Sequence, residues 1–319
     1  MNSIVRKHIT ILLLGLLTFI WLMPLAYVLQ AQEETETLLT QEETQAEEEA
    51  EEEASEQVEE EPGEEAAQTL PDSAYILQRR RLNEEIDDQH AQLLGELSTY
   101  QENERKFRVA HDQYSRLQTL NSIEGVVAAA KTLIASRNTA LNSYLNLLRL
   151  KLIESEGVEI SHKNRALERV ENLQLQLQNH SALLNDVNDR EGINELNSIF
   201  SPLVEQISET SYYALSILTI GRLQAVYDQA IVINQKIKGD ISDEQLALSN
   251  TRSRNLAEVD KLIANIPPLF QAAWADVAQA EVRNNGYSIL YRGLSEKLNV
   301  IYARVSRLVS YFEELEGVR

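Results

Sequence analysis

The sequence predicts an all-α protein: an elongated antiparallel bundle of long, coiled-coil-like helices. Two observations predict this class. Residues 71–319 contain only four prolines and nine glycines, and leucine, alanine, glutamine, glutamate and asparagine dominate them; such a composition favours long helices. Apolar residues recur at alternating spacings of three and four, the period of packed helices, and no strand-like alternation persists. We therefore expect residues 71–319 to form one bundle of about six helices.

The pattern of residues 1–31 indicates that the protein is exported. Arg6 and Lys7 precede an uncharged run that lasts from Ile9 to Ala31. A signal peptide has an apolar core of about 7–15 residues, and a spanning helix needs about 20. The run fits a signal peptide if cleavage follows Ala31, and a membrane anchor if residues 9–29 are retained. Both alternatives place the rest of the chain outside the cytoplasm, secreted or anchored to the membrane.

Residues 32–70 form an acidic, low-complexity segment. Between Glu33 and Glu65 there are 17 glutamates and no basic residue. Such a segment cannot bury enough apolar surface to fold, so we expect a disordered, self-repelling spacer. It carries most of the net charge of −21, since residues 71–319 hold 33 acidic and 27 basic residues. No basic patch indicates a nucleic-acid partner. The absence of cysteine excludes disulfides, thiolate metal sites and a cysteine nucleophile.

The first two predicted helices cover residues 73–119 and 121–156. On the first, two interleaved sets recur every seven residues and form a packing seam: Ile86, Leu93, Tyr100, Phe107, Tyr114 and His90, Leu97, Glu104, His111. Asn121 and Glu124 have the spacing of a capping box at the start of the second helix. Gly157 suits the left-handed residue that follows its end.

The third and fourth predicted helices cover residues 161–188 and the segment from Ile193 to Gly239. Ser201-Pro202 restarts or kinks the fourth helix. The stretch Tyr212–Ile233 is apolar on nearly all sides, which is typical of a central helix. We expect it to form the core of the bundle and not a second membrane segment.

A capping box at Ser242 predicts a fifth helix that lasts to Asn265. Pro267-Pro268 then separates it from a sixth helix over residues 269–315. The second half of the sixth helix has the most regular seam in the chain: Tyr287, Tyr291, Leu294, Leu298, Ile301, Val305, Leu308, Phe312 and Leu315.

The sequence contains no recognisable catalytic motif. Bundle di-metal sites use two Glu-x-x-His pairs, and this chain has one, Glu159 with His162. His90 and His111 share a seam, where polar residues more often set the register between helices. No glycine-rich phosphate loop, G-x-S-x-G or HExxH motif occurs. We therefore expect no enzyme activity, no metal and no cofactor.

Large apolar residues follow the proline break. If Phe270, Trp274 and Tyr287 are exposed, they form a partner-contact tip. If they are buried, they pack the corner between helices. Both interpretations stay open at the level of sequence.

The favoured function is that of a non-enzymatic, exported structural or protein-interaction protein of the cell envelope. Its partners would be the membrane, through residues 9–29 if uncleaved, and proteins or a second copy, through helix faces. The alternative is an extracytoplasmic ligand-binding or sensory helical module that works with a membrane partner and holds a small molecule near Tyr212–Ile233.

Overall fold

The computed structural model describes residues 70–243, 250–282 and 286–317. These residues form helices and no strand, which confirms the all-α prediction. Seven helices are described: α3 (Leu70–Leu117), α4 (Leu120–Glu154), α5 (Ile160–Leu183), α6 (Arg190–Asp243), α7 (Asn250–Asn265), α8 (Pro267–Val282) and α9 (Tyr287–Gly317). The predicted export segment and acidic spacer lie outside the described residues. None of the described helices combines the length and apolar character needed to span a bilayer.

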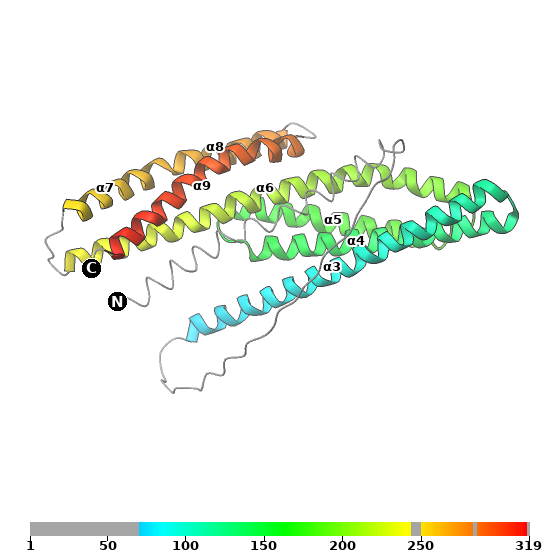
Figure 1. The fold of residues 1–319 in the computed structure, drawn as a ribbon, viewed down its shortest axis with the longest axis horizontal. Helices are drawn as coiled ribbons and strands as arrows, with labels where there is room; N and C mark the ends of the chain where they lie inside the picture. The colour runs from blue at the N-terminus through cyan, green and yellow to red at the C-terminus, as the bar shows by residue number, and fades with distance from the viewer. Residues whose placement is uncertain (1–69, 244–249, 283–285, 318–319) are drawn as a thin grey trace, which may run out of the picture.

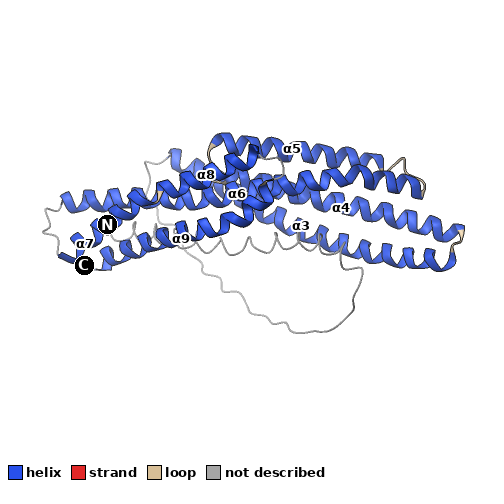
Figure 2. Cartoon of the chain, turned by 90° about the horizontal axis from the view of Figure 1, so that it is seen from above, coloured by secondary structure: helices blue, strands red, loops and turns tan. Residues whose placement is uncertain are grey.

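The helices form an elongated bundle organised around α6. Helices α4 and α5 lie beside the first part of α6, α3 packs on α4, and α7, α8 and α9 lie beside the second part of α6 (Figures 1 and 2). With 54 residues, α6 is about 80 Å long at 1.5 Å per residue. α6 therefore belongs to both halves of the bundle.

The middle of α6 is the core, as its apolar composition predicts. Thr210 to Leu218 are all buried, and the side chains of Tyr213 and Ile217 are 0 % exposed. Side chains from α4, α5, α7, α8 and α9 join these residues in one large apolar cluster. The central-helix prediction is confirmed.

Helices α3 and α4 form a hairpin. Ile86 and Leu93 pack against Leu147 and Leu150 in a small separate cluster. The turn differs from the prediction, because Thr119 and not Asn121 caps α4. The Thr119 backbone is extended, and its hydroxyl accepts a hydrogen bond from the amide of Ser122 at 3.3 Å. α4 has therefore already begun at Asn121, and the predicted capping box with Glu124 is wrong.

The turn between α4 and α5 lies directly against α6. α4 ends at Glu154, earlier than predicted, and Gly157 follows with a φ of +74°. A Cβ atom on Gly157 would stand 2.2 Å from the carbonyl oxygen of Gly221, and one on Gly221 would stand 2.2 Å from Cγ2 of Val158. Only glycine fits at both positions, so this pair lets the turn approach the backbone of α6.

Several predicted boundaries along α6 are wrong. Of the two alternatives predicted at Ser201-Pro202, the restart is wrong, because the helix continues through Pro202. Pro202 is exposed, as is Ser198 four residues earlier, so the carbonyl that loses its partner faces water. Gly239 lies inside the helix, and Ser242 belongs to α6 and does not open the next helix. α5 also ends before its predicted limit of residue 188.

The predicted sixth helix is in fact two helices. α8 ends at Val282 and α9 begins at Tyr287, and the two pack against each other. The predicted seam of α9 is confirmed, because Leu294, Ile301 and Leu308 are each 2 % exposed or less. The break at residues 267–268 is also confirmed.

Candidate functional site: the polar junction of α5, α6, α8 and α9

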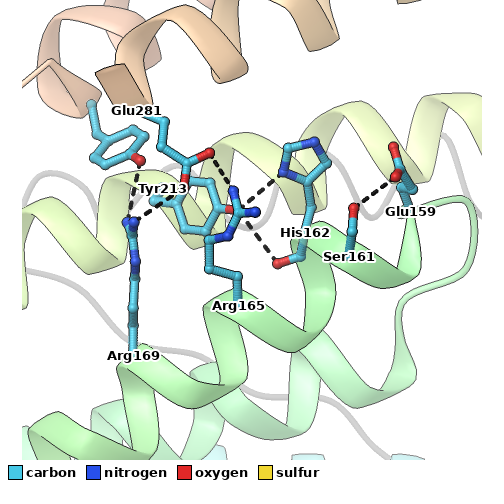
Figure 3. A network of polar contacts seen from close by, with 8 residues as sticks. Glu159, Ser161, His162, Arg165, Arg169, Tyr213 and Glu281 are labelled. Carbon is cyan, nitrogen blue, oxygen red and sulfur yellow. Dashed lines mark hydrogen bonds and ion pairs between the residues drawn. The ribbon is translucent and has the colours of Figure 1, made fainter. Parts of the chain in front are cut away.

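One face of α5 carries three basic or polar side chains. His162, Arg165 and Arg169 are spaced by three and four residues, which places them on the same side of the helix. Figure 3 shows them directed toward Tyr213 on α6 and Glu281 on α8. α5 thus presents a polar stripe to two helices that follow much later in the sequence.

The carboxylate of Glu281 is the anionic centre of the junction. Arg165 donates from Nη1 to Oε2 of Glu281, and Nη2 of Arg169 lies 3.4 Å from Oε1. Arg169 also donates from Nη1 to the hydroxyl of Tyr287 at 3.2 Å. The negative charge of Glu281 raises the pKa of Arg165. The two arginines and one carboxylate therefore connect α5 to α8 and α9.

Aromatic and imidazole groups complete the junction. The hydroxyl of Tyr213 lies 3.1 Å from Nδ1 of His162, and the ring of Trp274 stacks on the imidazole at a centroid distance of 5.1 Å. Trp274 donates from Nε1 to Gln224 at 2.9 Å. Burial and the nearby charge of Glu281 raise the pKa of Tyr213 to about 12. Tyr213 therefore stays protonated at neutral pH and works as a hydrogen-bonding group, not as a nucleophile.

The first turn of α9 is held by a carboxylate from α6. Glu209 accepts a hydrogen bond from the backbone amide of Tyr287 at 3.0 Å. A carboxylate at a helix N-terminus satisfies a free amide and interacts favourably with the helix dipole. This contact fixes where α9 begins relative to α6.

The three residues predicted to form a contact tip lie in or beside this junction. Phe270 is 5 % exposed and Tyr287 is 6 % exposed, and Trp274 is half-buried. Phe270 packs on Tyr227 with a ring-centroid distance of 5.8 Å. Their burial matches the alternative interpretation, in which these side chains pack the corner between helices.

Sequence reasoning missed Arg165, Arg169, Glu209 and Glu281. The 3-4 spacing of the stripe on α5 was a usable signal, but nothing in the sequence pairs it with α8. The four described histidines do not gather: His162 is in the junction, while His90, His111 and His180 lie elsewhere. On α3, His90 is half-buried and His111 is exposed.

A second buried polar cluster holds His180. The imidazole donates from Nε2 to the carbonyl of Leu196 at 3.0 Å, and its Nδ1 accepts from the amide of Asn138 at 2.9 Å. Arg137 lies over the ring of Phe200, 3.4 Å from its centroid. Burial lowers the pKa of Arg137 to about 10 and also lowers the pKa of His180. His180 is therefore held neutral, as one tautomer.

Both clusters are suited to joining helices. In the part of the chain that the structure describes, no group of three or more histidine, aspartate or glutamate side chains could hold a metal ion. Comparison with family models, with curated proteins and with solved structures finds no match to this chain.

Proposed function

We propose that this protein is a non-enzymatic structural or protein-interaction protein of the cell envelope. It would be exported by residues 1–31 and would present an elongated helical bundle beyond an acidic spacer. The observation that carries this proposal is the contrast between a rigidly packed centre and a long exposed flank: α3 has 48 residues and packs substantially on α4 alone. Such a helix offers most of its circumference to partners.

The polar junction supports the same proposal. Its hydrogen bonds and ion pairs join α5 to α8 and α9, so the two halves of the bundle are held in one arrangement. A protein that positions partners along its length needs a fixed shape. The junction would supply that shape and no chemistry of its own.

The alternative, a ligand-binding or sensory module, has less support. The apolar surface of the predicted ligand region, Tyr212–Ile233, is largely covered by neighbouring helices. A small molecule there would have to displace packed side chains.

The test combines shape, location and contacts. A compact particle of about 250 residues has a radius of gyration near 18 Å, and we expect X-ray scattering to give a clearly larger value. Protease added to intact cells should digest the bundle, and a photo-crosslinker at exposed Val109 should capture envelope proteins or a second copy. A compact, protected protein that captures nothing would contradict the proposal.

A further inference from the structure

The first turns of α3 form a helix end with few neighbours. Tyr75 and Arg79 both contact Glu156, which lies past the end of α4, so the residues before Arg79 extend beyond their partner helix. Tyr75, Ile76 and Leu77 are 55 %, 60 % and 54 % exposed. Figure 1 shows the start of α3 standing apart from the other described helices. Because they are consecutive, the three side chains point in different directions around the helix, and Leu77 is the one that points away from α4.

The charges on this part of α3 are segregated. A basic block at residues 79–81 is followed by an acidic block at residues 84–88. Arg79 pairs with Glu156, but neither Arg80, Arg81 nor the four acidic side chains form an ion pair with a described residue. Further along the same helix such pairs do form, between Lys106 and Glu102 and between Arg108 and Glu104. Among the described residues, Arg80, Arg81, Glu84 and Glu85 therefore have no ion-pair partner.

The spacing of these residues places them on one face. Leu77, Arg81, Glu84 and Asp88 lie at i, i+4, i+7 and i+11, and each is exposed. Ile86 and Leu93 face α4 on the opposite side. The outward face of α3 therefore carries an exposed apolar residue, a cation and anions in that order along one line.

We propose that this face pairs with the same face of a second copy, with the two α3 helices antiparallel. The proposal deepens the function proposed above and rests on it. A two-fold axis between residues 82 and 83 sets Arg81 of each copy opposite Glu84 of the other, whereas Arg80 and Glu85 lie on the two edges of the face. A two-fold interface is self-complementary, because each patch serves twice.

The antiparallel direction follows from the order of the charges. In a parallel pair in register, Arg81 would face Arg81 and Glu84 would face Glu84, which repel. In the antiparallel pair each basic block faces an acidic block. Leu77 of each copy then lies opposite Asp88 and within a turn of the exposed Ala91 of the other. Because the surface is small and charged, the pair is weak and weakens as salt rises.

Sedimentation of the full chain in detergent micelles at 50 mM salt and up to about 100 µM protein tests the proposal. We expect a dimer. Reversal of the basic block (Arg80→Glu with Arg81→Glu) or of the acidic block (Glu84→Arg with Glu85→Arg) should weaken it at least roughly tenfold. Because the substituted side chains are exposed, circular dichroism should show unchanged helix content.

The decisive arm is an equal mixture of the two reversed proteins. Their blocks are complementary, so the mixture should form a heterodimer although neither protein pairs with itself. The matched control reverses Lys106 and Arg108, which lie on the same helix outside the patch, and should leave the dimer intact.

A monomeric parent protein, a dimer indifferent to the reversals, or a mixture that stays monomeric would each overturn the pairing. None of these results bears on elongated shape or envelope location, which test the proposed function separately.

Discussion

Helices α6 and α3 are the two longest described helices, with 54 and 48 residues, and they lie in opposite environments. Over α6, the whole stretch from Thr210 to Leu218 is buried, and four other helices pack on it. Over α3, Ile86 and Leu93 are the buried apolar side chains among the described residues. α6 therefore contributes much more to stability than α3 despite their similar length, because the favourable free energy of folding follows the apolar surface that is buried.

The largest expected difference concerns glycines. In α6, Gly221→Ala would place a methyl group 2.2 Å from Val158 Cγ2 and 3.0 Å from its backbone nitrogen. We expect a loss of more than about 3 kcal/mol in unfolding free energy, because backbone cannot yield as a side chain can. Gly95→Ala in α3 is the matched control: its Cβ would meet nothing within 4 Å. That variant should gain roughly 0.5–1 kcal/mol from helix propensity. Urea unfolding followed by circular dichroism measures the unfolding free energy of both variants. Equal changes in the two variants would contradict the difference in packing between α6 and α3.

Truncation of apolar side chains should show the next largest difference. Ile217 in α6 is 0 % exposed, and Ile217→Ala should cost about 2–5 kcal/mol through lost burial and a residual cavity. Leu94 in α3 is 55 % exposed, and Leu94→Ala should change stability by no more than about 0.5 kcal/mol. Thermal and urea unfolding give the two values. A costly Leu94→Ala would mean that this face of α3 is covered in solution, for example by a second copy.

The smallest effect is a dependence on pH. The pKa of His180 is lowered in the folded protein by burial, which outweighs its bond to Leu196, and by the charge of Arg137. Its stabilising contribution is complete above the unfolded value of about 6.5 and is lost as pH falls through the folded pKa, because the unfolded chain takes up the proton more readily. Stability measured between pH 8 and 5 should decline below about 6.5.

The control for this prediction comes from α3. His180→Gln should remove the part of the decline that His180 causes, whereas His111→Gln, at an exposed position, should retain it. A parent protein whose stability stays level down to pH 5 would show that His180 takes up its proton without cost.

The features that could be predicted from the sequence are those that follow from the periodic spacing of apolar residues. The seam of α9 and the buried centre of α6 follow from apolar spacing alone, and both are confirmed. The chain reverses direction between α8 and α9. This reversal was not predicted because the apolar spacing continues across it without interruption. The buried residues of α8 are spaced by three and four: Phe270, Ala273, Val277 and Ala280. Tyr287, the first residue of the α9 seam, follows Ala280 by seven residues, so the heptad spacing is unbroken. A continuous spacing cannot distinguish one long helix from two that fold back.

The polar junction could not be predicted from the sequence for a different reason. Arg165 and Glu281 are separated by 116 positions, and periodicity does not say which helices become neighbours. Likewise, Phe270 and Tyr287 have the composition of a contact surface, and only the packing of α6 against α8 and α9 decides that they are buried.

The isolation of α3 has a mechanical consequence. Tension applied at the N-terminal end of α3 would act on a helix end that stands apart from the other described helices. The load would first meet the contacts of Tyr75 and Arg79 with Glu156 and then the small cluster around Ile86 and Leu93. α3 would thus detach from α4 first, and the core around α6 would come under load only after α3 has separated.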